Sequence, residues 1–188
     1  HNGEGYDFNF IMQELAKIPS MDPKKFDIIA DSSEKIRYFT INIGGKKKLI
    51  FKDTFAFVSQ SLSSWLESTK KTNCSFSRFS NAFPNRLQRE FVLQKNPFPY
   101  NAIQKPEDLQ REITALDLWF TAENRVELFC DKYTEEELHK IYIEWFVPAK
   151  EAFAWQTIED YYKTYLKCDV TQLCDCMEHF VENVENLI

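Results

Sequence analysis

The stretch that decides the fold lies near the end of the chain and reads Tyr161-Tyr162-Lys163-Thr164-Tyr165-Leu166-Lys167-Cys168-Asp169-Val170-Thr171-Gln172-Leu173. Apolar residues recur through it and beyond it at intervals of three and four, the spacing of a helix with one buried face. The residues of this predicted buried face are Leu166, Val170, Leu173, Met177, Phe180, Val181 and Val184. Tyr165 and Asp169 are one helical turn apart, so their side chains are expected to project side by side.

A phenol beside a carboxylate suits a metal site. The carboxylate can hold a divalent cation, and the phenol can orient a water molecule bound to that cation. A helix surface that carries an unrelated aspartate gives the same spacing, so the pair gains meaning only with a partner elsewhere in the chain.

Composition narrows the class of protein. A chain of 188 residues can form one domain with a substantial core, or part of a larger one, and its 17 Phe and 4 Gly argue against disorder. Cys174, Cys176 and His179 lack the second ligand pair of a structural zinc site, so we expect reduced thiols and an intracellular protein. Nucleus, mitochondrion and viral replication site are not distinguished. No apolar run is long enough to span a membrane, and we expect no membrane partner.

Charge divides the chain unevenly. Residues 1–106 hold sixteen Lys and Arg against ten Asp and Glu, whereas residues 107–188 hold seven against nineteen. The basic part could follow a phosphate backbone, and the acidic part could supply carboxylates or simply be solvated.

Local patterns predict a helix, a meander of strands and then further helices. A helix begins at Asp7, where a carboxylate is favourable, and ends before Pro19. Strands are expected over 26–30, 38–43 and 48–57, with a hairpin turn at Gly44-Gly45. A short helix follows residues 59–61. The capping box at Thr134 opens a helix that Pro148 ends, and Thr157 starts the final helix.

Residues 67–107 are rich in Ser, Asn, Pro and Phe and are expected to form a long surface segment. Arg78, Arg86, Arg89 and Lys95 lie among its aromatic residues. Such interleaving could hold single-stranded nucleic acid, because bases stack on rings while cations neutralise phosphates. The aromatic residues could equally pin a long loop onto the core. No linker divides the chain, so we expect one partial domain made of segments 1–66, 67–156 and 157–188.

Read together, the two ends resemble family B DNA polymerases. Asn2-x-x-x-Tyr6-Asp7 is similar to the second motif of their 3′–5′ exonuclease domain, and Tyr165-x-x-x-Asp169 is similar to the third. Ser61-Leu62-x-x-Trp65 and Lys95-x-x-Phe98 resemble motifs of the protein-primed branch that organelles, viruses and transposons carry. The resemblance covers nearly the whole chain.

The resemblance implies an α/β fold of the ribonuclease H-like class, a mixed sheet flanked by helices and incomplete at its N-terminus. It also implies two Mg²⁺ or Mn²⁺ ions, with Asp7 and Asp169 as metal ligands. Tyr165 would hydrogen-bond the attacking water, and Lys95 would lie near the scissile phosphate. The residues implied to contact DNA are His1, Asn2, Tyr6, Ser61, Leu62 and Phe98.

The family's first motif, Asp-x-Glu, is absent from the sequence. The chain begins with His1, so we expect a fragment of a longer polymerase, with a degenerate copy as the other explanation. Expected partners are the single-stranded primer terminus, the rest of the polymerase and a terminal priming protein. Two alternatives stay open: a module that binds single-stranded DNA or the priming protein without catalysis, and an α/β interaction domain with accidental motifs.

Overall fold

The computed structural model describes residues 7–19, 22–32 and 35–186. The chain divides into two compact units, His1–Ser61 and Leu62–Ile188. The boundary between the units lies directly before a helix that begins at Leu62, and the expectation of one partial domain stays a prediction. Each unit is described by itself.

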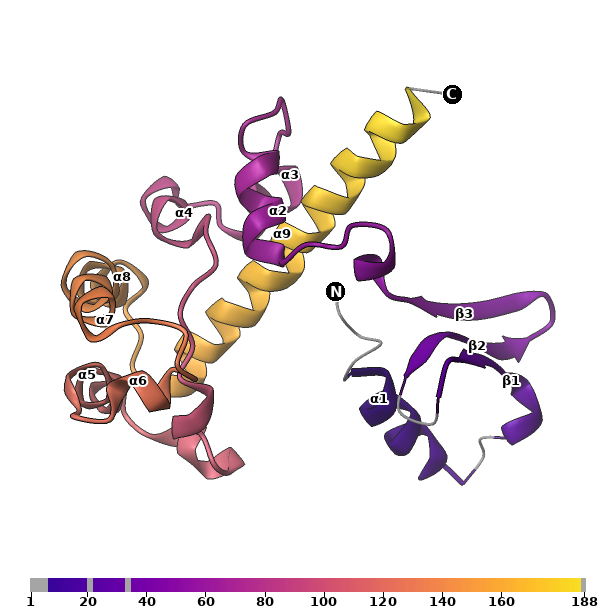
Figure 1. The fold of residues 1–188 in the computed structure, drawn as a ribbon, viewed down its shortest axis with the longest axis horizontal. Coiled ribbons are helices and arrows are strands. Elements are labelled where there is room, and N and C mark those ends of the chain that lie inside the picture. The colour runs from indigo at the N-terminus through magenta and orange to yellow at the C-terminus, as the bar shows by residue number, and fades with distance from the viewer. Residues whose placement is uncertain (1–6, 20–21, 33–34, 187–188) are drawn as a thin grey trace. The chain divides into compact units, whose positions relative to one another are not determined.

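The first unit is a helix packed on an antiparallel sheet (Figure 1). Its main elements are α1 (Asp7–Ala16), β1 (Phe26–Ala30), β2 (Ile36–Gly44) and β3 (Lys47–Lys52), with short 3₁₀ turns at Pro23–Lys25 and Thr54–Ala56. The strands follow the order β1-β2-β3, and both described pairings are antiparallel. The helix start at Asp7 and the strand positions are as expected, except that the hairpin turn is Gly45-Lys46, because Gly44 still belongs to β2, and that β3 stops at Lys52. There the Asp53 carboxylate accepts the Phe55 N–H at 2.8 Å and starts the 3₁₀ turn.

The core of this unit is built around Phe39, which is fully buried in the middle of β2. Its ring stacks on Phe51 of β3 at 4.3 Å between centroids, and Phe8 of α1 meets it edge-on at 5.4 Å. Because side chains alternate along a strand, α1 covers the face that carries Phe39 and leaves the opposite face of the sheet to other contacts.

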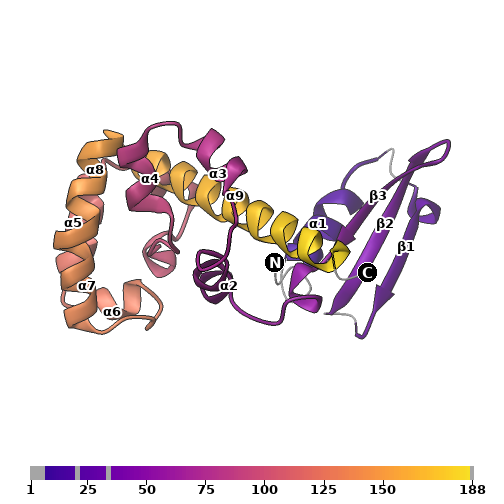
Figure 2. The ribbon, with the colours of Figure 1, turned by 90° about the horizontal axis from the view of Figure 1, so that it is seen from above.

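The second unit is helical and is organised along one long helix. Its elements are α2 (Leu62–Thr69), α3 (Ser77–Ala82), α4 (Arg86–Val92), α5 (Thr114–Thr121), α6 (Arg125–Leu128), α7 (Glu135–Ile141), a π-helical segment (Tyr142–Phe146), α8 (Val147–Phe153) and α9 (Ile158–Glu185), with 3₁₀ turns at Tyr100–Ala102 and Pro106–Gln110. Figures 1 and 2 show α5 to α8 gathered at the beginning of α9, and α2 and α3 alongside its later turns.

The capping box predicted at Thr134 and the helix start predicted at Thr157 are confirmed, and Thr157 proves to form a capping box as well. The hydroxyls of Thr134 and Thr157 accept N–H groups of Glu137 and Asp160, whose carboxylates bind back to the threonine N–H groups. The expected stop at Pro148 is wrong. The chain continues as π-helix into α8, and Pro148 stands in the first turn of α8, where the N–H that proline lacks has a smaller role.

The predicted buried face of α9 is also wrong. The residues that α9 buries are Ile158, Tyr161, Tyr165, Cys168, Gln172, Asp175 and Cys176. By contrast, Leu166 and Val170 are 41% and 59% exposed. Two of the buried side chains, Gln172 and Asp175, are polar. Gln172 hydrogen-bonds to backbone in the segment before Lys95, and Asp175 hydrogen-bonds to backbone in α3. These bonds, together with the large rings of the tyrosines, set the rotation of the helix.

The segment 67–107 is not a surface loop. It contains α3 and α4, and its rings Phe79 and Phe83 pack with Val92 against Cys168 of α9. Residues 96–99 are buried as well. Of the two interpretations of its aromatic residues, attachment to the core therefore holds for these rings.

The mixed α/β character expected from the sequence is confirmed. The molecule is a three-stranded antiparallel sheet followed mostly by helices, and 59% of it is helical, so helix packing provides most of the core. In the part of the chain that the structure describes, no helix has both the length and the apolar composition needed to cross a bilayer.

The N-terminus of α3 depends on a side chain from α9. The residue before α3, Phe76, makes no side-chain cap. Instead Asp175, 3% exposed, accepts the N–H groups of Arg78 and Phe79 at 2.9 and 2.8 Å. One carboxylate thus caps a helix and joins it to α9.

We therefore predict that Asp175→Ala lowers the free energy of unfolding by about 3 kcal/mol, because two charge-assisted hydrogen bonds are lost and the amides stay partly buried. Urea denaturation followed by circular dichroism measures the change. Glu182→Ala, an exposed carboxylate on the same helix, is the matched control and should change stability little. Equal stability of the two variants would contradict the capping role.

Candidate functional site

Three residues from separate sequence motifs meet beside α9. Lys95 follows α4, whereas Tyr165 and Asp169 lie one turn apart on α9. The Lys95 ammonium donates to the Tyr165 hydroxyl at 2.6 Å and forms a hydrogen-bonded ion pair with the Asp169 carboxylate. It also lies 4.6 Å from the centroid of the Tyr165 ring. We call these residues the Lys95 cluster.

The cluster lies at the edge of the core. The Lys95 and Asp169 side chains are 32% and 25% exposed, whereas Tyr165 is 4% exposed. The charges are thus partly shielded from water, which strengthens their interaction, and they remain reachable from solvent.

The segment that carries Lys95 is held by its backbone carbonyl groups. The Gln172 side-chain amide donates to Val92 O at 2.6 Å and to Gln94 O at 3.2 Å. On the other side of Lys95, the buried Tyr161 hydroxyl donates to Pro97 O. Both donors belong to α9, so the helix that carries Tyr165 and Asp169 also positions Lys95.

Phe98 lies behind the cluster rather than in front of it. Its ring is 7% exposed and packs 4.8 Å from the Tyr165 ring and 4.9 Å from the Tyr100 ring. In this position the Phe98 ring packs against the two tyrosines, and its predicted contact with DNA stays a prediction.

Tyr100 was not singled out as a site residue from the sequence. Its hydroxyl lies 2.5 Å from the Tyr165 hydroxyl, and the Lys132 ammonium lies 5.0 Å from its ring centroid. The local sequence signal for Tyr100 is its place in the run Pro97-Phe98-Pro99-Tyr100, which overlaps the end of the Lys95-x-x-Phe98 motif.

The surroundings keep the Tyr165 phenol protonated. Burial raises its pKa far above that of free tyrosine, and the nearby Asp169 charge and the Tyr100 hydrogen bond raise it further. Burial, more than any other cause, also raises the pKa of Tyr100. Two neutral hydroxyls therefore stand beside one ammonium and one carboxylate.

This arrangement can receive an anion. An ammonium has three N–H donors, and two of them are engaged by Tyr165 and Asp169. Among the described residues no partner takes the third, which can therefore bind a ligand. A phosphate oxygen is a suitable acceptor, and the Tyr100 hydroxyl, on a side chain that is 45% exposed, lies within the same group.

The described residues do not by themselves fit a two-metal centre. Among residues 7–19, 22–32 and 35–186, no group of three or more His, Cys, Asp or Glu is arranged to hold a metal ion. Asp169 supplies a carboxylate, but Lys95 already neutralises it. The expected magnesium or manganese ions therefore stay a prediction, and no reaction step is derived through them.

The other predicted site residues lie elsewhere. Asp7 begins α1 and is exposed, in the first unit, whereas Asp169 is in the second. Ser61 and Leu62 stand on the two sides of the boundary between the units. His1, Asn2 and Tyr6 lie outside the described residues. The expected meeting of Asp7 and Asp169 stays a prediction.

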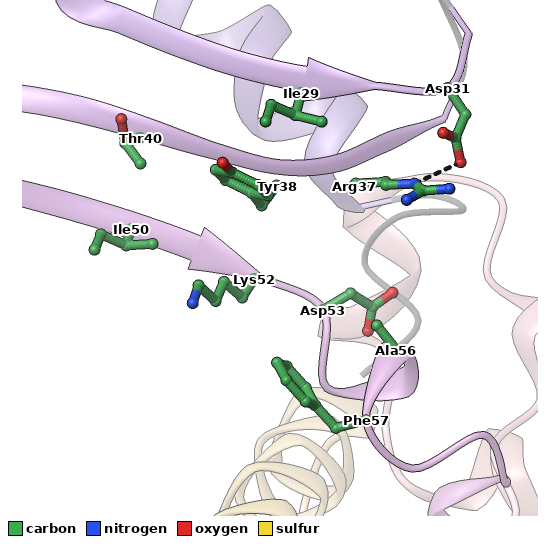
Figure 3. A pocket seen from close by; sticks show the side chains of 10 residues that line it. All are labelled: Ile29, Asp31, Arg37, Tyr38, Thr40, Ile50, Lys52, Asp53, Ala56 and Phe57. Atoms are coloured by element: carbon green, nitrogen blue, oxygen red, sulfur yellow. Dashed lines mark hydrogen bonds and ion pairs between the residues drawn. The ribbon is translucent and has the colours of Figure 1, made fainter.

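A further hollow lies on the first unit, on the sheet face opposite α1. It has a volume of about 770 Å³, and Figure 3 shows it between the strand side chains Tyr38, Ile50 and Lys52 and the ring of Phe57. At its edge Arg37 pairs with Asp31 at 2.8 Å. Most of the exposed lining is apolar, and none of the residues that the sequence motifs singled out lines it.

We predict energetic coupling between Lys95 and Asp169. Lys95→Met leaves the Asp169 carboxylate partly buried without its cation, and Asp169→Asn leaves the ammonium without its anion, so each should destabilise the protein. The double variant should lose less than the sum, with a coupling of about 1–2 kcal/mol in urea denaturation.

The control is the pair Lys163–Glu159, 2.9 Å apart on the same helix, whose side chains are 66% and 34% exposed. Lys163→Met and Glu159→Gln should show a smaller coupling, because solvent screens the Lys163 ammonium. Strictly additive effects at Lys95 and Asp169 would show that their contact contributes nothing.

We also predict a pH dependence from Tyr165. Its pKa is raised in the folded state, so stability is fully present below the unfolded tyrosine pKa of ~10 and is lost as pH rises above it. Tyr165→Phe should make the free energy of unfolding fall less steeply above that pH. Urea denaturation over a series of alkaline buffers measures this. An unchanged slope would mean that Tyr165 is accessible to hydroxide in the folded protein.

Comparison of the chain with protein-family models, curated proteins and solved structures finds no match. The geometry of the Lys95 cluster and the motifs that form it therefore carry the functional argument.

Proposed function

We propose that residues 1–188 form part of the 3′–5′ exonuclease region of a family B DNA polymerase, which acts on single-stranded 3′ ends during DNA replication. The observation that supports this best is the contact of Lys95 with Tyr165 and Asp169. The resemblance places Lys95 in one motif and places Tyr165 and Asp169 in another. Lys95 is 70 positions from Tyr165 and 74 positions from Asp169 in the sequence, and its side chain hydrogen-bonds to both.

The contact matters because the two motifs were identified independently of one another. A lysine three residues before a phenylalanine and a tyrosine four residues before an aspartate are each common patterns. Nothing in either spacing requires the two to be neighbours in space. The three side chains meet at the edge of a core, and hydrogen bonds to the backbone on both sides of Lys95 hold the lysine there. A shared site requires both.

Within this proposal each group has a role that its chemistry permits. Lys95 attracts the phosphate of the terminal nucleotide, and charge complementarity in a partly dry site makes that attraction strong. Tyr165 stays protonated and offers its hydroxyl to a polar group of the substrate or to a water molecule. Tyr100 positions Tyr165 through the bond between their hydroxyls.

The proposed fold is the ribonuclease H-like class, and Asp7 and Asp169 are proposed as carboxylates of its metal site. In such sites divalent cations activate the attacking water and stabilise the leaving oxygen. Asn2, Tyr6, Ser61 and Leu62 are proposed to hold the terminal nucleotides, with His1 beside them. The rest of the polymerase and a terminal priming protein are the proposed partners.

A second candidate function is a binding module without catalysis, which takes single-stranded DNA or the priming protein. The ion pair between Lys95 and Asp169 favours it, since a neutralised carboxylate is a weaker ligand for a cation. The lack of a metal-binding group among the described residues favours it too. Both candidates predict DNA binding, and they differ in whether a completed carboxylate set gives hydrolysis.

The test of binding uses two forms of one oligothymidylate, linear with a free 3′ end and circular, in the presence of a chelator. Fluorescence anisotropy should show tighter binding of the linear form, because the site receives an end. Lys95→Met should remove this preference, whereas Lys163→Met should keep it. Equal affinity for both forms, unaffected by Lys95→Met, would contradict the proposed site.

The test of activity adds Mg²⁺. Residues 1–188 alone should not shorten the oligonucleotide, because the Asp-x-Glu carboxylates are absent from the sequence. A chain extended by a segment with that motif should shorten it, Asp169→Ala should abolish this, and Tyr165→Phe should reduce it less. Shortening by residues 1–188 that survives Asp169→Ala would place the activity elsewhere.

A further inference from the structure

A second group of cations lies in the helical unit, in a groove beside α3 and α4. The groove has a volume of about 510 Å³, and the side chains that line it include Lys70, Ser75, Phe76, Ser80, Arg86 and Arg89. We call it the α3–α4 groove. Lys95, Tyr165 and Asp169 do not line it, so it is separate from the Lys95 cluster.

Arg89 is held in place by the backbone that it touches. Its Nη1 donates to Phe83 O at 2.9 Å and to Pro84 O at 3.0 Å. These bonds occupy the two hydrogens of Nη1, and within the described part of the chain no partner takes the hydrogens of Nε and Nη2. The result is a half-buried, positioned guanidinium with donors to spare, which is the usual element of a phosphate site.

The other two cations are held only by local ion pairs. Arg86 pairs with Glu90 at 3.2 Å one helical turn on, and Lys70 pairs with Glu67 at 2.7 Å. Pairs of this kind contribute little to stability, so a phosphate can take their place at small cost. Of the carboxylates, Glu90 lines the groove, and the three cations outweigh its charge.

Phe76 adds an aromatic surface to these cations. Its φ of 47° lies in the left-handed region, which is unfavourable for a bulky side chain. The Asp175 cap on the following amides holds the backbone there. A ring beside phosphate-binding cations is the combination that single-stranded nucleic acids occupy, because bases of any sequence stack on it.

The groove is close to the Lys95 cluster along the chain. Leu93 lines the groove, and Lys95 follows it by two residues. Consecutive Cα atoms are 3.8 Å apart, so the backbone path between these two residues is at most ~7.6 Å. A strand whose end is at Lys95 could therefore reach the groove with its next nucleotides.

We propose that the α3–α4 groove binds phosphodiester groups of single-stranded DNA, with Arg86, Arg89 and Lys70 on the phosphates and Phe76 against a base. This deepens the proposed function, on which it rests for the identity of the strand. The groove contacts the body of the strand, and the Lys95 cluster contacts its end.

The experiment measures affinity for linear and circular oligothymidylate of roughly 16 nucleotides, with a chelator present, over a range of salt concentrations. The test variant is Lys70→Gln/Arg86→Gln, which breaks only local ion pairs and spares the anchored Arg89. The control is Arg78→Gln, an exposed arginine of α3 that pairs with Glu178 at 2.6 Å and does not line the groove.

The double variant should bind both DNA forms ~25-fold more weakly at about 0.1 M salt, and the slope of log K against log salt should fall by ~1.4, because two phosphate contacts are lost. Arg78→Gln should stay near the wild type. Phe76→Leu should weaken binding roughly tenfold to normal DNA, and much less to an abasic strand. Circular dichroism confirms that each variant is folded.

Three results would overturn the proposal: no DNA binding by the wild type, equal losses in the double variant and Arg78→Gln, or no loss in either. Displacement of the strand by millimolar inorganic phosphate at matched ionic strength would also overturn it, since the groove would then be a site for free phosphate. The proposed function is tested separately, by the preference for linear over circular DNA and its loss in Lys95→Met. A groove that fails while this preference is kept is therefore distinguishable from a failure of the proposed function.

Discussion

The helical unit depends on how a non-helical stretch of backbone is held inside it. Between Phe91 and Pro97 the chain leaves α4 and runs beside α9 without regular hydrogen bonding, and a buried carbonyl without a donor costs about 1–3 kcal/mol. Trp145 donates to Phe91 O at 2.7 Å, Gln172 donates to Val92 O at 2.6 Å, and the Tyr161 hydroxyl donates to Pro97 O. These bonds join α4, α9 and the π-helical segment around one stretch, and Lys95 lies within it.

The same bonds explain where sequence patterns succeed and where they fail. The capping boxes at Thr134 and Thr157 could be predicted, because neighbours in sequence satisfy them. The hairpin could be predicted from its glycines as well, although its turn lies one residue later than expected, at Gly45-Lys46. The rotation of α9 could not. The spacing of apolar residues predicts that Val170 is buried. In the structure Gln172 and Asp175 are buried instead, because they hydrogen-bond to backbone groups about 80 to 97 positions away in the sequence. Hydropathy assigns these polar residues to the surface, and only tertiary contacts reveal that their hydrogen bonds are satisfied inside.

The candidate site shows the same division between local and distant information. Helical spacing alone predicts that Tyr165 and Asp169 are neighbours. The contact with Lys95 was not predicted, because the family resemblance implied only that Lys95 lies near the scissile phosphate. Tyr100 was missed, since its approach to Tyr165 depends on the turn at Tyr100–Ala102 rather than on any spacing in the sequence. Of the groove cations, the sequence pattern singled out Arg86 and Arg89 but not Lys70, because their convergence depends on tertiary packing.

The polar groups around Lys95 are not all paired, and this bears on what the site is for. Asn96 Oδ1 and Gln172 Oε1 are buried acceptors without a hydrogen-bond partner among the described residues. An apolar filling of this region would avoid that cost. A packing that retains these amides, an ion pair and two tyrosine hydroxyls fixes one ammonium at the protein surface. Lys95 can give its remaining donor to a phosphate without leaving Asp169, whereas a cation on Asp169 must displace it. This arrangement can therefore accept an anion such as a phosphate oxygen, whereas the hydrolysis that we propose would need further carboxylates.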